Sequence, residues 1–188
     1  FSIVILCALL SHSRRIWWVS VSAMIITTVI YGTSILVSVF TFRSSIPENW
    51  SIAACDVGQG DALLLQSQGR YLLIDVGRKP EPLTRCLQQL GISHIDLLVL
   101  THFDKDHVGG LSAVVGKVDT AVVGKPENAE DQSLLAALSR AGADVHRGTQ
   151  GLGVSLGTTQ WQVLWPDSSH PTMQMGNPGS VTLLVTFS

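Results

Sequence analysis

The sequence is poor in charged residues, and basic residues are not in excess. Charged residues make up 14% of the chain and the mean hydropathy is +0.33, whereas about 25% of the residues in soluble globular domains are charged. Residues 47–188 contain nine Lys and Arg against fourteen Asp and Glu, which gives a formal net charge of −5. This balance excludes a broadly basic nucleic-acid-binding surface over that part of the chain.

Charge is missing altogether from the 27 residues of segment 16–42. A run of about 20 such residues is enough to cross the hydrocarbon core of a bilayer. A signal peptide has a shorter apolar region and a small-residue cleavage site, and a buried helix of a soluble protein is the other alternative. The length of the run favours a membrane-spanning helix.

The residues before this run indicate its orientation. Segment 1–10 is apolar, too short to span a bilayer alone, and begins without methionine, so we expect the chain to start inside an earlier membrane helix of a larger multi-pass protein. Arg14 and Arg15 favour the cytoplasmic side. We therefore predict membrane segments over residues 1–46 and an extracytoplasmic domain over residues 47–188.

Cysteine is scarce too, with Cys55 and Cys86 the only two in the predicted domain. Their spacing matches no metal-binding motif. A domain outside the cytoplasm could join them in a disulfide, but two buried free thiols are the favoured prediction.

After residue 50, short segments punctuated by glycine replace the continuous apolar pattern. The apolar run 95–100 is typical of a strand buried on both faces, and ligand sites often lie at the carboxyl ends of such strands. The pattern as a whole predicts an α/β domain. Strands are predicted over 51–56, 62–66, 70–75, 95–100, 120–123, 151–157, 160–164 and 181–187, with a turn into another strand at 142–145; helices over 82–90, 108–116 and 132–141; and a loop over 167–179.

Two imidazoles and two carboxylates follow the buried strand within six residues, at His102, Asp104, Asp106 and His107. A short loop can turn several of these side chains inward, and their nitrogen and oxygen donors suit Zn²⁺ or Mn²⁺. Without a cation, neighbouring carboxylates would repel one another. The cluster predicts a metal site, with a solvated acidic turn as the alternative.

Two other segments could contribute to such a site. Asp75 ends a predicted strand just before Gly77, where a carboxylate can accept bonds from loop amides or histidines, although taken alone it is more typical of a turn residue. In the turn 56–61, two glycines allow tight folding that would bring Gln59 and Asp61 toward a site above the sheet. The turn lacks the third glycine and the following helix of a dinucleotide-binding fingerprint.

The cluster resembles the metallo-β-lactamase signature His-x-His-x-Asp-His, with Asp104 in place of the second histidine. Together with Asp56-Val-Gly-Gln-Gly-Asp-Ala62, Leu73-Ile-Asp-Val-Gly77 and the hydrophobic segment upstream, the chain resembles the ComEC family of DNA-uptake channel proteins. The three motifs occur in that family's order and spacing. The resemblance implies a metallo-β-lactamase-like αββα sandwich, incomplete at its carboxyl end, behind a transmembrane helix.

The resemblance also implies roles for the site residues. It implies one or two divalent ions, Zn or Mn, held by His102, Asp104, Asp106 and His107. Asp106 and Asp75 would serve catalysis, Asp106 as a ligand or as the base that orients water, and Asp75 in support of the metals. Gln59, Asp61 and Asn177 are candidates for binding substrate, and Ser180 accompanies Asn177. His170 has no match at the level of a motif, and the family's later aspartate and final histidine are expected to be missing.

By the same resemblance, the chain is expected to belong to an inner-membrane protein that contacts membrane lipid, incoming DNA and other DNA-uptake machinery. Its extracytoplasmic domain would be a metal-dependent nuclease that degrades the non-transported strand. Two alternatives stay open. One is a hydrolase of the same fold with a non-DNA substrate, favoured by the negative charge. The other is a non-catalytic, channel-associated module whose site is weak or empty.

Overall fold

The computed structural model describes residues 13–44, 47, 49–167, 169 and 176–187. The chain divides into two compact units, residues 1–47 and residues 48–188. The expected apolar helix over 1–10 and the candidate His170 lie outside the described residues.

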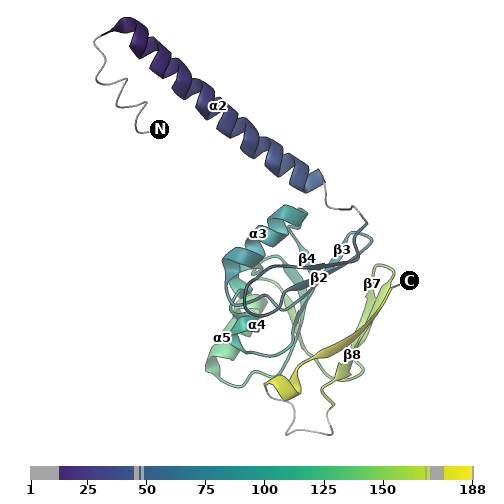
Figure 1. The fold of residues 1–188 in the computed structure, drawn as a ribbon. Helices are drawn as coiled ribbons and strands as arrows, with labels where there is room; N and C mark the ends of the chain where they lie inside the picture. The colour runs from purple at the N-terminus through teal and green to yellow at the C-terminus, as the bar shows by residue number, and fades with distance from the viewer. Residues whose placement is uncertain (1–12, 45–46, 48, 168, 170–175, 188) are drawn as a thin grey trace. The chain divides into compact units, whose positions relative to one another are not determined.

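The first unit contains the helix α2, Arg14–Ser44 (Figure 1). Its segment Arg14–Ser38 has a mean hydropathy of 1.8 and is long and apolar enough to cross a membrane. The side chains along it are mostly exposed, including Ile25, Val29 and Leu36. An apolar helix whose described side chains are mostly exposed fits the predicted membrane-spanning role.

The second unit is built on a six-stranded sheet in the order β1-β2-β3-β4-β5-β6. The first three strands form an antiparallel meander, and β3 to β6 run parallel. Every residue of β4 except the partly buried Asp96 is buried, as its continuous apolar run predicts. The strands are β1 (Ile52–Ala54), β2 (Leu63–Ser67), β3 (Arg70–Ile74), β4 (Ile95–Leu100), β5 (Val118–Val123) and β6 (Asp144–Arg147).

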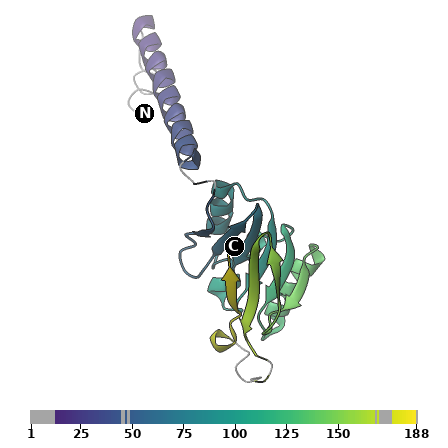
Figure 2. The ribbon, with the colours of Figure 1, turned by 90° about the vertical axis from the view of Figure 1, so that its right-hand side faces the viewer.

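Helices cover one face of this sheet and a second sheet covers the other (Figures 1 and 2). The helices are α3 (Pro80–Leu90), α4 (Lys105–Val108) and α5 (Ala129–Arg140). The second sheet is antiparallel, in the order β7-β8-β9, with β7 (Gly153–Leu156), β8 (Thr159–Trp165) and β9 (Thr182–Thr186). This α/β arrangement confirms the predicted fold class.

Each face of the large sheet has its own hydrophobic core. On the helix side, Leu83 and Leu138 pack against the buried Leu98. On the other side, Trp161 and Val163 of β8 pack against the large sheet. Burial of apolar area holds the three layers together.

The predicted helix over 108–116 is wrong. The structure has the single turn α4 and a 3₁₀ turn η1, Leu111–Ala113, separated by Gly109 and Gly110. A Cβ at Gly110 would approach the carbonyl oxygen of Val76, and the amide of Gly110 donates to Gly77 O at 2.8 Å. The glycines therefore serve close contact with the loop after β3, which a continuous helix would prevent.

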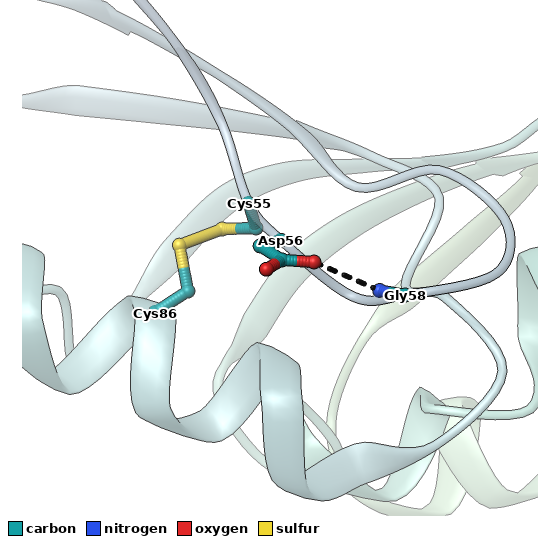
Figure 3. The surroundings of a disulfide bond; sticks show 4 residues. All are labelled: Cys55, Asp56, Gly58 and Cys86. Carbon is teal, nitrogen blue, oxygen red and sulfur yellow. Dashed lines mark hydrogen bonds between the residues drawn. A yellow bond between two sulfur atoms is a disulfide. The ribbon is translucent and has the colours of Figure 1, made fainter.

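The predicted free thiols are also wrong, because Cys55 and Cys86 form a disulfide (Figure 3). Cys55 follows β1 directly, and Cys86 lies on α3. The bridge thus joins the start of the turn 56–61 to the helix layer. Spacing along the sequence could not decide this pairing, because the two residues meet only when α3 packs beneath the sheet.

Candidate metal centre

The candidate site lies where strands of the large sheet end. Asp75 follows β3 and Thr101 follows β4, and these strands are neighbours in parallel register. The carboxyl ends of parallel strands meet at one sheet edge. The loop after β4 then turns into α4, which brings His102 and His107 to the same edge, with their ring centroids 4.1 Å apart.

Asp75 is the buried centre of this site. Its side chain is 3% exposed. Its Oδ1 accepts from the Thr101 amide at 2.8 Å, and its Oδ2 accepts from Thr101 Oγ1 at 2.7 Å and lies 2.8 Å from His107 Nδ1. Its φ is +57°, a left-handed conformation that aspartate tolerates better than most side chains. The fold thus directs one buried carboxylate toward both motif loops.

The hydrogen bonds around His102 indicate which ring nitrogen is protonated. Thr101 Oγ1 donates to Asp75, so its lone pairs can accept from His102 Nδ1, 3.1 Å away. That tautomer leaves Nε2 unprotonated. His102 is 5% exposed, and its Nε2 is buried without a hydrogen-bond partner among the described residues. A buried nitrogen with a free lone pair is suited to binding a metal ion.

His107 has the equivalent arrangement without an intermediary. Its Nδ1 bonds Asp75 Oδ2 directly, which leaves Nε2 as the ring nitrogen available to a ligand. The hydrogen bond to Asp75 raises the pKa of His107 above its ordinary value, and the nearby Asp106 and Asp61 raise it further, against the effect of burial.

This raised pKa predicts how the stability of the metal-free protein depends on pH. The protonated His107 contributes stability that is complete below the unfolded pKa of about 6.5 and is lost as the pH rises through the higher folded pKa. Urea denaturation in EDTA should therefore show the free energy of unfolding falling above pH 6.5. His107→Gln should remove this decline and the exposed His94→Gln should keep it; a wild-type curve that rises instead would contradict the assignment.

The turn 56–61 closes over α4. Gly60 has a φ of +93°, and a Cβ there would overlap the carbonyl group of Asp106. Asp61, two residues before β2, reaches the site, with its Oδ2 3.9 Å from His107 Nδ1. Gly60 thus allows the backbone of the turn to approach the backbone at Asp106 closely. The turn also brings Asp61 toward the candidate site, as expected from its glycines.

The segment before β9 completes the site from the second sheet. Ser180 Oγ lies 3.2 Å from His102 Nδ1, and Asn177 Nδ2 donates to Asp104 Oδ2 at 3.4 Å. The amide of Val181 donates to Thr101 O at 2.9 Å. Asn177 and Ser180 line a cavity of about 460 Å³ together with Asp61, Asp75, His102 and His107.

Not every predicted site residue reaches this cavity. Gln59 accepts a hydrogen bond from Arg78 Nη1 at 2.6 Å, and both side chains are exposed. Neither Gln59 nor Asp106 is among the described residues that line the cavity. The sequence suggests that Gln59 faces substrate. In the structure its side chain instead bonds Arg78 in the loop after β3.

The four predicted ligands come together only in part. His102 Nε2 lies 3.4 Å from Asp104 Oδ2. Elsewhere in the described chain, His94, Asp96 and Asp119 bring three potential ligand atoms within 4.8 Å of one another. Arg70 Nη1 and the Tyr71 amide already occupy the two carboxylate oxygens of Asp96, so this second cluster is satisfied without an ion.

The residues at the strand ends nevertheless fit a divalent cation. The buried Nε2 of His102 has no hydrogen-bond partner among the described residues, and the carboxylate oxygen Oδ2 of Asp104 lies 3.4 Å from it. The fold family implies divalent metal binding, and these donors are of the type that Zn²⁺ and Mn²⁺ accept. His102, Asp104, Asp106 and His107 are the residues that could hold it.

Thr101 is the functional residue that sequence reasoning missed. Its amide and hydroxyl both donate to Asp75, and its hydroxyl also contacts His102. A threonine at the end of an apolar strand gives no distinctive signal, because threonine is common in strands. Only the pairing of β3 with β4 identifies its partners.

Three curated relatives match this chain over part of their length. The chain is 37% identical over 89 residues to Competence protein ComA of Neisseria gonorrhoeae, which covers 44% of this chain and 13% of that protein. It is 26% identical to Recombination protein 2 of Haemophilus influenzae, over 79% of this chain and 19% of that protein. It is 27% identical to ComE operon protein 3 of Bacillus subtilis, over 91% of this chain and 24% of that protein. These relatives confirm the resemblance to ComEC-type proteins, of which the chain spans less than a quarter.

Solved structures agree on the fold. A metallo-beta-lactamase mutant from Cronobacter sakazakii superimposes with a TM-score of 0.53 at 17% identity, over 74% of this chain and 58% of that chain. CmlA, a diiron beta-hydroxylase from Streptomyces venezuelae, gives 0.51 at 20% identity, over 76% of this chain and 29% of that chain. The family model described as the metallo-beta-lactamase superfamily matches residues 55–183.

Proposed function

The chain belongs to the metallo-beta-lactamase superfamily, and from this premise we propose that its second unit is a metal-dependent nuclease that degrades one strand of DNA during uptake. The observation that carries the proposal is the pair His102 and His107. His107 Nδ1 bonds Asp75 directly and His102 Nδ1 contacts Asp75 through Thr101, while the buried Nε2 of His102 has no hydrogen-bond partner among the described residues. The similarity to ComEC-type proteins, a family of DNA-uptake channels, supports DNA as the substrate class.

In this proposal, His102, Asp104, Asp106 and His107 hold one or two ions of Zn or Mn. A bound divalent cation supplies hydroxide near neutral pH and offsets charge on a phosphodiester. Asp75 keeps both imidazoles in the tautomer that presents Nε2.

The remaining side chains act on water and substrate. Asp106 serves either as a ligand or as the base that orients the attacking water. Asp61 and Asn177 line the cavity and contact the bound strand. Gln59 contributes indirectly, by holding Arg78 at the rim.

We further propose an inner-membrane, multi-pass protein with this unit on the extracytoplasmic side, in contact with lipid, incoming DNA and other uptake machinery. Arg14 and Arg15 at the start of α2 favour a cytoplasmic start. The Cys55–Cys86 disulfide supports the outward placement, because disulfides persist in oxidising compartments.

The test is cleavage of end-labelled single-stranded DNA by the detergent-solubilised chain after EDTA treatment and addition of Mn²⁺, Zn²⁺ or Mg²⁺. We expect cleavage with at least one ion and none in EDTA. His94→Ala is the matched control, because its exposed cluster should contribute neither bound metal nor activity. A chain that binds metal at the site yet stays inert with all three ions would overturn the nuclease proposal.

Two other functions have specific support. The net charge of −5 favours a hydrolase of a non-DNA substrate, since DNA binding uses Lys and Arg to neutralise phosphates. An affinity for DNA that does not weaken as the salt concentration rises would favour this non-DNA hydrolase. The partial assembly of the four ligands favours a non-catalytic module, and metal analysis that finds no ion at the site would support that function.

A further inference from the structure

Arg147 is a partly buried cation without a counter-charge. Its Nε is buried and has no hydrogen-bond partner among the described residues, and the described chain contains no carboxylate in an ion pair with it. Burial alone lowers the pKa of its guanidinium, with no acidic group acting in the opposite direction. Buried polar groups are normally paired, so an unpaired guanidinium calls for a ligand.

Four other basic side chains of this unit have partners, whereas Arg147 combines the lack of one with a buried Nε. Arg70 pairs with Asp96, Arg78 donates to Gln59, Lys117 Nζ donates to Ala113 O, and Arg140 Nε donates to Ala136 O. In a domain with excess negative charge, a cation kept away from carboxylates is available to an external anion.

Arg147 also lies at the edge of the sheet that carries the site. It ends β6 and pairs with Val123 of β5, which in turn pairs with Leu100 of β4. Its backbone is thus two strands from β4, about 10 Å at the usual strand spacing. Thr101 and His102 directly follow Leu100.

Close backbone packing ties this region to the site. A Cβ at Gly148 would lie 2.7 Å from Val181 Cγ2, and Val181 directly follows Ser180. A Cβ at Gly124 would lie 3.3 Å from His102 Cα. Arg147 precedes the first glycine and Lys125 follows the second.

Lys125 adds a second cation on this side. Its side chain is partly exposed, and within the described residues it forms no ion pair or hydrogen bond. Glu127 is the nearest acid along the chain, and its Oε1 accepts from the amide of Gly176. The ends of β5 and β6 therefore provide two basic side chains without a counter-charge among the described residues, at the sheet edge that also carries the candidate site.

We propose that Arg147, together with Lys125, binds a backbone phosphate of the nucleic-acid strand next to the phosphodiester held at the histidines. The proposal rests on the proposed function and names residues that position its substrate. A guanidinium binds phosphate oxygens through charge-assisted, bidentate hydrogen bonds. A phosphate would supply the negative counter-charge that the partly buried guanidinium of Arg147 lacks among the described residues.

The test measures binding of a fluorescent, phosphorothioate-linked single-stranded oligonucleotide to the full chain in detergent with Mn²⁺, by anisotropy. Arg147→Gln should weaken binding about tenfold or more, and should reduce the slope of log K against log salt by about 0.7 for each lost phosphate contact. Lys125→Gln should act in the same direction. Arg140→Gln makes the same change of charge on α5 and should stay within about twofold, because exposed charges are screened.

Thermal unfolding separates this role from a structural one. If Arg147 serves a ligand, Arg147→Gln should have a Tm equal to or above that of the wild type, because the variant removes an unpaired buried charge. A lower Tm together with unchanged oligonucleotide affinity would overturn the proposal. Equal affinities for Arg147→Gln and Arg140→Gln would also overturn it.

A wild-type chain that binds no oligonucleotide would contradict the proposed function instead. In that case, calorimetry with inorganic phosphate tests whether Arg147 and Lys125 bind an anion. Phosphate binding that Arg147→Gln weakens would uphold an anion site at this edge, and absence of phosphate binding by the wild type would reject it.

Discussion

Asp75→Ala is expected to lower the free energy of unfolding by about 3–5 kcal/mol, the usual loss when one partner of a buried charged network is removed. The Thr101 amide, the Thr101 hydroxyl and His107 Nδ1 would all lose their acceptor. Alanine is also less tolerant than aspartate of the φ of +57° at this position. The substitution therefore removes hydrogen bonds and strains the backbone at once.

The same variant should lose metal affinity. A residue that orients metal-binding histidines typically contributes 10–100-fold to affinity. Asp75→Asn retains one acceptor oxygen and tolerance of the left-handed backbone, so it should lose less stability than Asp75→Ala while still weakening metal binding. Urea denaturation and chelator competition measure the two effects, with the exposed Asp144→Ala as control. Stability within 1 kcal/mol of wild type for Asp75→Ala would refute its central position.

Removing the disulfide should have an effect of similar size. The bridged residues are 31 apart in sequence, and closing a loop of that length restricts the unfolded chain by about 3–4 kcal/mol. Because Cys55 directly precedes the turn 56–61, the double variant Cys55→Ala/Cys86→Ala should also make that turn more mobile over α4.

Denaturation of the wild type with and without a thiol reductant measures this contribution. Reductant should lower the midpoint for the wild type and leave Cys55→Ala/Cys86→Ala unchanged. The single variant Cys7→Ala keeps the bridge and should behave as the wild type. A reductant effect that persists in the double variant would show that the loss has another source.

Local patterns predicted most of the fold. The alternation in β8 and the continuous apolar run of β4 each reflect how a strand is buried, so they are visible in the sequence. The boundaries of α5 were less accurate: the structure begins it at Ala129, capped by Asn128, where apolar spacing alone predicts a start at residue 132. The prediction of a helix over 108–116 was wrong because Gly109 and Gly110 pack closely against the loop after β3, a contact that the local sequence does not reveal.

Part of the cavity lining could be anticipated from residues that lie close together in the chain. His102 and His107 of the motif and Asp61 of the turn line the cavity, whereas Asp104 and Asp106 are not among its lining residues. Relations between distant segments were not predictable: Thr101 with Asp75, Gln59 with Arg78, and Cys55 with Cys86 depend on strand order and helix packing. The proposed phosphate contact at Arg147 is of the same kind, because it follows from the register of three strands.

The contact between His102 and Ser180 spans 78 residues of sequence. During synthesis, which proceeds at about 5–20 residues per second, the histidine therefore emerges about 4–16 s before its serine partner. A nascent chain can form the large sheet and both motif loops in that interval, but it lacks the segment that closes the cavity. The cavity is therefore complete only after the second sheet has docked, several seconds after its histidines have been synthesised.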